Sequence, residues 1–181
     1  MMTAAFALGQ RASDLRRAFD QAFAEPPRGA PLETLDLLAI RIAGDPYALK
    51  ITELVGLESK RKIVPLPSAR ADLLGIAGIR GGLVSVYSLS ALLGYDASPS
   101  STRWLALSGI PDPIALAFED LEGFHRVAHA EFRAPPHLDA SKHHVTLTVR
   151  IGKGTRLVVD VRSILAALKV GAGTSTSTKE P

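Results

Sequence analysis

Regular alternation of apolar and polar side chains limits the fold of this sequence more than any other feature. In VTLTVRI, residues 145–151, four aliphatic side chains alternate with two threonines and an arginine. A GKG turn and a second apolar stretch ending at Val161 follow, which is the pattern of a β-hairpin. A period of two places every second side chain on the same face of a sheet. The segment therefore predicts two antiparallel strands with one buried face.

Other short segments of the chain have the same strand-like character. Turn-forming residues separate them, including AGDPY before residue 48 and GIPDP before residue 114. In KIVPLP the two prolines favour a strand edge or a crossover, because proline cannot donate to a sheet. The segments predicted as strands in this way are 38–42, 47–51, 62–67, two within 75–89, 104–107 and 114–118.

Three helices are predicted. Apolar residues at i, i+4, i+7 and i+8 predict a helix over residues 13–24, which ends at EPPRGAP. A short helix from Ser88 to Leu93 is expected to close the first half of the chain. Ser163 is expected to cap a second short helix that carries Ile164, Leu165 and Leu168.

These elements predict a mostly β fold: two small five-stranded β-barrel subdomains packed together, with an N-terminal helix and a short helix closing each half. The polar, proline-containing YDASPSST, residues 95–102, is the expected internal boundary. Whether strands are exchanged between the two barrels is left open. The expected parts are an N-terminal helix and linker (1–33), a first barrel (34–97), a second barrel (98–170) and a disordered tail (171–181).

Composition excludes several classes of function. Lys and Arg (21) barely exceed Asp and Glu (18), and aromatic residues make up only 6%, so a nucleic-acid surface is not predicted. The chain contains no cysteine, which excludes disulfides and thiolate sites. No apolar run approaches the roughly 20 residues that span a bilayer, and the opening residues lack the basic region of a secretory signal. We therefore expect a soluble, cytoplasmic protein.

No enzyme, metal or cofactor motif stands out. His125 and His129 have the spacing of zinc ligands on a helix, but HExxH is absent, and ordinary histidines are the favoured interpretation. In FEDLEGF the acids Glu119 and Asp120 are interpreted as solvated, with the aromatic residues, including Phe124, packed. A small β-barrel hydrolase that uses Glu119 and Asp120 is a remote alternative.

Residues 47–94 resemble the first half of a CheW domain, the adaptor domain that couples chemoreceptors to the histidine kinase CheA in bacterial chemosensory arrays. The most diagnostic part is the Arg-Gly of GIRGG, Arg80 and Gly81. Later, IALAFEDLEGFHRV and GTRLVVDVRSILAAL are similar to the second half of the family pattern, so the resemblance covers about residues 35–169. The positions that match in the first half are Tyr47, Leu54, Leu57, Ile63, Leu66, Pro67, Gly75, Arg80, Gly81, Val84, Val86 and Leu89.

The chain departs from this pattern at four polar positions. The Glu of the family's Val-x-Glu-Ile motif is replaced by Gly56, and the Asn before the arginine by Gly78. The Pro and Asp of Val-Pro-x-x-Asp-Leu are replaced by Ser85 and Ser88. The losses at Gly56 and Gly78 put one of the usual contacts in doubt. An adaptor that binds receptor, has lost kinase binding and modulates the array is therefore the alternative hypothesis.

The resemblance implies a non-enzymatic scaffold without cofactor, associated with receptor arrays through its partners. An apolar groove between the barrels would receive the tip of a receptor helix hairpin. A strand-edge or barrel-end surface would contact the CheA regulatory domain or another CheW-like domain. The residues expected to bind these proteins are Leu54, Gly56, Arg80, Gly81 and Val84.

Arg80 has two expected roles. Near the groove, its fork of donors suits a partner's backbone carbonyls or carboxylate. The other role is internal, because an arginine on a buried strand can reach outward to cap the barrel's own carbonyls. The surrounding glycines would let the strand bend and let another backbone approach closely.

Overall fold

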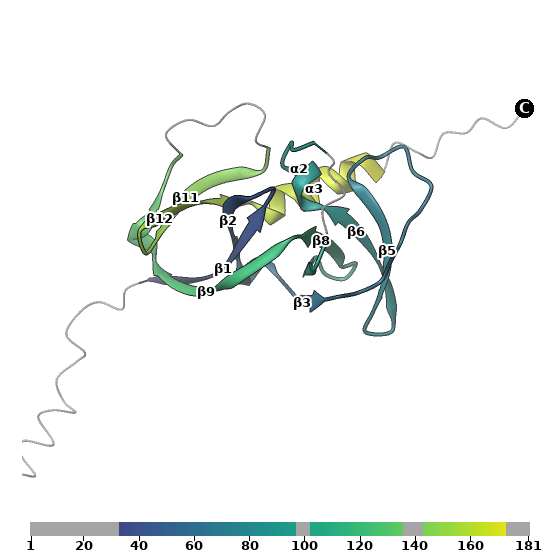
Figure 1. The fold of residues 1–181 in the computed structure, drawn as a ribbon, viewed down its shortest axis with the longest axis horizontal. Helices are drawn as coiled ribbons and strands as arrows, with labels where there is room; N and C mark the ends of the chain where they lie inside the picture. Colours follow the sequence, from purple (N-terminus) through teal and green to yellow (C-terminus); the bar gives the residue numbers. More distant parts are fainter. Residues whose placement is uncertain (1–32, 97–101, 136–142, 173–181) are drawn as a thin grey trace, which may run out of the picture. The chain divides into compact units, whose positions relative to one another are not determined.

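The structure is a computed structural model that describes residues 33–96, 102–135 and 143–172 of the 181-residue chain. The chain divides into two units at Glu33/Thr34, and all described elements lie in the second, Thr34–Pro181 (Figure 1). The helix expected over 13–24 and most of the expected disordered tail lie outside the described residues.

Two six-stranded sheets form the body of the second unit. Sheet A has the order β10-β11-β12-β2-β1-β9, and its strands are β1 (Thr34–Ile42), β2 (Asp45–Lys50), β9 (Asp120–Ala128), β10 (Phe132–Arg133), β11 (Val145–Ile151) and β12 (Gly154–Val159). Sheet B has the order β3-β7-β8-β6-β5-β4, and its strands are β3 (Gly56–Ser59), β4 (Ile63–Val64), β5 (Leu73–Ile79), β6 (Gly82–Ser88), β7 (Trp104–Ser108) and β8 (Ile114–Phe118).

The mostly β fold with two packed β subdomains is confirmed, but each sheet has six strands where five were expected. No strand was predicted from alternation at β3, β9 or β10, and β10 has only two residues, too few to show a period of two. Each sheet contains strands from both sides of segment 97–101. Parallel pairing of β12 with β2, and of β6 with β8, joins the two parts of the chain.

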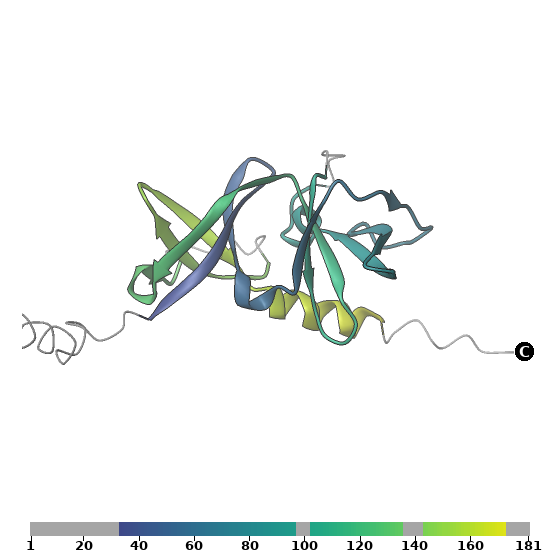
Figure 2. The same ribbon diagram turned by 90° about the horizontal axis from the view of Figure 1, so that it is seen from below.

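Two helices of the described part connect and cover the sheets. The helix α2 (Leu89–Leu92) follows β6, and the Ser88 Oγ accepts a hydrogen bond from the Ala91 N–H at 3.3 Å, as a helix cap does. The helix α3 (Val161–Ala172) is longer than expected; in Figure 2 it begins beside sheet A and continues along the lower side of sheet B. Its cap is Asp160 rather than Ser163, because the Ser163 N–H donates to the Asp160 carboxylate at 3.0 Å.

Alternation along the strands produces three apolar clusters. Leu38 faces a central cluster that fills the space between the sheets and α3, whereas its neighbour Leu37 belongs to a second cluster on the other face of sheet A. A third cluster, which includes Val84, lies on the face of sheet B that points away from the central cluster. Successive side chains point to opposite faces of a strand, so each sheet packs on both sides.

Two further contacts tie sheet A to sheet B and to the end of α2. Tyr95 follows α2, and its hydroxyl donates to the Asp45 carboxylate of β2 at 2.5 Å and lies 2.8 Å from the Tyr47 hydroxyl.

Residues 51–55 pass from β2 to β3 through a 3₁₀ turn, η1 (Ile51–Glu53). We call residues 51–55 the crossing segment.

Candidate binding surfaces

An apolar cavity of about 260 Å³ opens beside the crossing segment. Leu38 and Phe124 line it from sheet A, and Leu54, Gly56 and Leu57 line it from the crossing segment and β3. None of the residues that line it carries a charge. The cavity is suited to bury apolar side chains of a partner.

Phe124 projects from the rim of this cavity. Its side chain is 65% exposed, so the interpretation of Phe124 as a packed residue is wrong. The physical reason is its position: Phe124 lies on β9, an edge strand of sheet A that pairs only with β1, where it is opposite Leu38. A useful signal was present in the sequence, because Phe124 falls in the same period-two phase as the charged Asp120, Glu122 and Arg126 in DLEGFHR. An exposed aromatic ring beside an apolar cavity is typical of an interface anchor.

The crossing segment is fixed from several directions. The Glu53 side chain is only 6% exposed; its carboxylate accepts a hydrogen bond from the Val161 N–H at the start of α3 and lies 3.4 Å from the Lys50 Nζ. The Ser108 hydroxyl donates to the Glu53 carbonyl at 2.6 Å. The cavity therefore has a rigid floor before any partner binds.

Arg80 occupies the turn between β5 and β6. Its φ of 50° and the φ of 83° at Gly81 are the left-handed conformations of a tight hairpin turn. The Arg80 side chain is 65% exposed, and its Nε lies 3.6 Å from the Glu58 carboxylate. Arg80 therefore does not reach out of a buried strand, and the nearby acceptor is a carboxylate of β3.

Gly56 provides the space for this arrangement. A Cβ at Gly56 would lie 2.9 Å from Arg80 Nη2, so the guanidinium rests against the bare backbone of β3. Gly56 also lines the apolar cavity, which places Arg80 next to that cavity. The sequence prediction that Gly56 and Arg80 belong to one surface is consistent with this geometry.

Glu58 holds two arginines at the end of sheet B. The Arg61 guanidinium donates to it through Nε at 3.1 Å and Nη2 at 2.7 Å. These hydrogen bonds, together with the charge of Arg80, hold the pKa of Glu58 below its usual value against the opposing effect of burial. The CheW pattern has its glutamate at the position of Gly56. In this chain a carboxylate, that of Glu58, is present two residues later.

Three other predicted residues differ in exposure. Leu54 is half-buried and lines the cavity, and Gly81 completes the hairpin turn. Val84 is only 5% exposed and packs in the core of sheet B, so its side chain is not presented to a partner. The alternation that buries Val84 turns its neighbour Leu83 outward.

Two acids of the acidic cluster, Glu122 and Asp120, lie against arginines. Glu122 lies between Arg41, at 2.5 Å, and Arg156, which both donate to it. Asp120 lies 3.9 Å from Arg103. No group of three or more histidine or acidic residues in the described part has the geometry to hold a metal ion.

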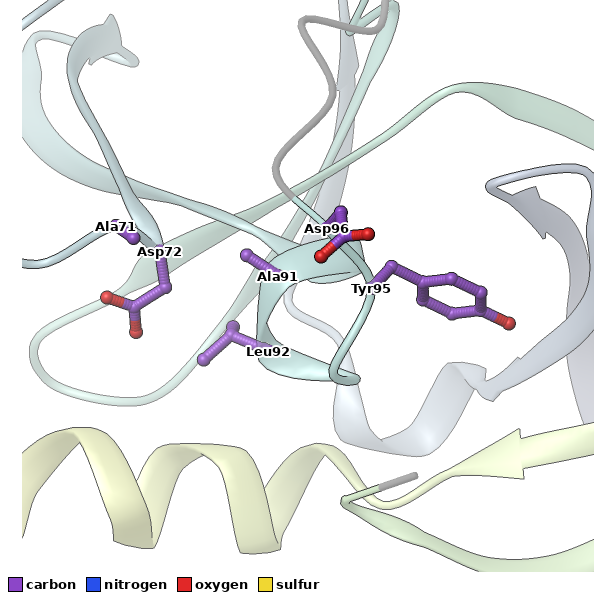
Figure 3. A pocket seen from close by; sticks show the side chains of 6 residues that line it. All are labelled: Ala71, Asp72, Ala91, Leu92, Tyr95 and Asp96. Atoms are coloured by element: carbon purple, nitrogen blue, oxygen red, sulfur yellow. The ribbon is translucent and has the colours of Figure 1, made fainter. Parts of the chain in front are cut away.

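A cavity of about 430 Å³ lies beside α2, lined in part by Asp72 and Asp96 (Figure 3). Arg70 donates to the Asp72 carboxylate at 2.7 Å, which neutralises one of the two acids. The Tyr95 ring is directed away from Asp72 in Figure 3, in keeping with its hydrogen bonds to β2. Polar groups therefore do not converge on a reacting position there.

Within the described residues, no helix is long and apolar enough to cross a bilayer.

Comparison with known proteins agrees with this architecture. The sequence shows no match among curated proteins. The structure is similar to the crystal structure of the scaffolding protein TtCheW from Thermoanaerobacter tengcongensis, with a TM-score of 0.62 and 14% identity. The similarity covers 70% of this chain and 89% of that chain, and at this identity it concerns the fold alone. The family model of the CheW-like domain matches residues 36–169, and the chain therefore belongs to the CheW-like domain family.

Proposed function

We propose that this protein is a coupling adaptor that links chemoreceptors to a CheA-type histidine kinase by docking, without catalysis. The observation that carries the proposal is the uncharged cavity beside the crossing segment, with Phe124 exposed at its rim. An amphipathic helix binds such a groove by burying its apolar face. The tip of a receptor helix hairpin is the proposed occupant.

The energy of this docking would come mainly from a few apolar contacts. Burying an aromatic ring such as Phe124 contributes about 1.5–3 kcal/mol. Because Glu53 and Ser108 already fix the crossing segment, little conformational entropy is lost there on binding.

We predict that Phe124→Ala weakens binding of a purified chemoreceptor tip hairpin by about tenfold or more, because an interface anchor is removed. Isothermal titration calorimetry measures the affinity. Val170→Ala is the matched control, since Val170 is an aliphatic residue of α3 that is 78% exposed and lies outside the cavity lining. Equal affinity of Phe124→Ala and the wild type would contradict the groove assignment.

We propose that the kinase regulatory domain binds the β5–β6 hairpin, which carries Arg80 at its turn and exposes Leu83. The presence of Glu58 beside Arg80 supports retention of a charged contact despite Gly56. The receptor-only alternative is tested by separate titrations with the receptor tip and the kinase regulatory domain. Binding of both supports the coupling adaptor, and binding of the tip alone supports the alternative.

A further inference from the structure

The apolar cavity continues into a second, charged cavity on the same face of sheet A. This second cavity, of about 310 Å³, is lined by Asp36, His125 and Arg126, and it shares Ile51 and Phe124 with the apolar one. Phe124 thus stands between an apolar and a charged compartment. The two compartments form one surface of mixed chemistry.

The register of β1 and β9 sets the spacing between the compartments. Leu38 is opposite Phe124, and two residues further along the same strands Asp36 is opposite Arg126. Residues two apart on a strand face the same side and lie about 6.6 Å apart. The bulge in this strand pair lies beyond Ala39, so the pairing between these positions is regular.

The Arg126 guanidinium has donor groups that its ion pair with Asp36 does not use. It binds Asp36 through Nε at 2.7 Å and Nη2 at 3.0 Å. Among the residues that the structure describes, no acceptor binds its Nη1. The Arg126 side chain is also the more exposed of the pair, at 71% against 44% for Asp36. A guanidinium fork of this kind favours a carboxylate as its second partner.

We infer that Arg126 is a specificity-determining residue that selects partner helices with a carboxylate three or four residues from the apolar anchor. On an α-helix, residues four apart lie about 6 Å apart along the axis, which matches the separation of the two strand pairs. A helix lying along β9 that sets an apolar side chain against Phe124 brings the residue one turn away to Arg126. This inference rests on the proposed docking of a helix in the groove.

The test uses the full-length protein and a recombinant chemoreceptor tip hairpin. Arg126→Glu is expected to weaken binding by about tenfold, because like charges then face each other. Each acidic residue of the hairpin that lies three or four positions from an apolar residue is then changed to lysine, one at a time. One of these changes is expected to return the affinity for Arg126→Glu to within about twofold of the original pair.

Two further variants separate recognition from stability. The double variant Asp36→Arg, Arg126→Asp keeps an ion pair but places a carboxylate at position 126. We expect it to weaken binding of the tip hairpin as much as Arg126→Glu does. Arg150→Glu is the control, because Arg150 is similarly exposed and pairs with Glu131 at 3.1 Å on another part of sheet A. Thermal melting checks that each variant is folded.

Wild-type affinity in Arg126→Glu or in the exchanged pair would overturn the inference, and so would the absence of any rescuing lysine. The proposed function is tested separately, by the affinity of the Phe124→Ala variant. Loss of binding in Phe124→Ala with no effect at Arg126 leaves the docking groove in place and removes only the charge selection. If neither variant changes the affinity, both the docking groove and the charge selection are contradicted.

Discussion

At the scale of single residues, the arginine in the apolar, glycine-rich stretch at 75–89 is explained by two neighbours. Glu58 supplies an opposite charge, and Gly56 supplies the space in which the guanidinium lies against β3. The pair is largely exposed on the arginine side, so its contribution to folding is small. Its position next to the cavity is what connects Arg80 with binding.

We predict that Arg80→Glu weakens binding of the receptor tip several-fold, because Glu58 repels the new carboxylate and moves it off β3. The free energy of unfolding should change by less than about 1 kcal/mol, as expected for an exposed pair. Fluorescence anisotropy with a labelled tip hairpin and urea denaturation measure the two quantities. Adding Glu58→Arg reverses the pair and should recover part of the binding; a folded Arg80→Glu variant with unchanged affinity would remove Arg80 from the site.

At the scale of elements, the start of α3 is a junction of several segments. Its first turn receives Glu53 from the crossing segment and its cap from Asp160. The Ser163 hydroxyl lies 2.8 Å from His144 Nδ1, on the loop before β11. Burial, helped by the neighbouring His143, lowers the pKa of His144, against an opposing effect of the Asp160 charge.

This histidine predicts a dependence of stability on pH. The unfolded chain takes up a proton near pH 6.5, whereas the folded protein does so only at a lower pH. The contribution of neutral His144 to the free energy of unfolding is therefore complete above pH 6.5. It is lost as the pH falls from there to the pKa of His144 in the folded protein. Urea denaturation at a series of pH values measures the slope.

His144→Asn is the control for this slope. Asparagine tolerates the positive φ of 59° at this position and does not titrate. We expect the decrease in stability between pH 7 and about 5 to be smaller in His144→Asn than in the wild type. Identical pH profiles would show that other groups cause it.

At the scale of the whole described unit, the two sheets share one apolar cluster with α3. Leu38, Leu116 and Ile164 meet there from sheet A, sheet B and the helix. The hydroxyl of Tyr95 adds a polar link to β2, and burial together with the bond to Asp45 raises the pKa of this tyrosine. Neither sheet is expected to keep its structure without the other, since both lose a buried face on separation.

We predict that Tyr95→Phe lowers the free energy of unfolding by about 1–3 kcal/mol, because a half-buried hydrogen bond to a carboxylate is lost. The loss should appear in a single cooperative transition detected equally by Trp104 fluorescence and by far-ultraviolet circular dichroism. Tyr87→Phe is the control, since the Tyr87 hydroxyl has no hydrogen bond to a described residue. Two separate transitions in the wild type would contradict the shared core.

Much of the fold follows from local pattern. The strand over Val145–Ile151 and the short helix that follows Ser88 depend on neighbours in the chain, and both occur as predicted. The matching positions around Arg80 indicate the family for the same reason, because they lie within one short segment. Periodicity and turn chemistry are properties of consecutive residues, so the chain alone is enough to reveal them.

The surface, by contrast, depends on contacts between residues far apart in the chain. Glu58 meets Arg80 from another strand, and Phe124 is exposed on β9, an edge strand of sheet A. Val84 shows the converse, since its apolar character matches the family but the packing of sheet B buries it. Burial and pairing are set by which segments pack together, and a period of two is the same whether the strand lies at an edge or at the centre of a sheet.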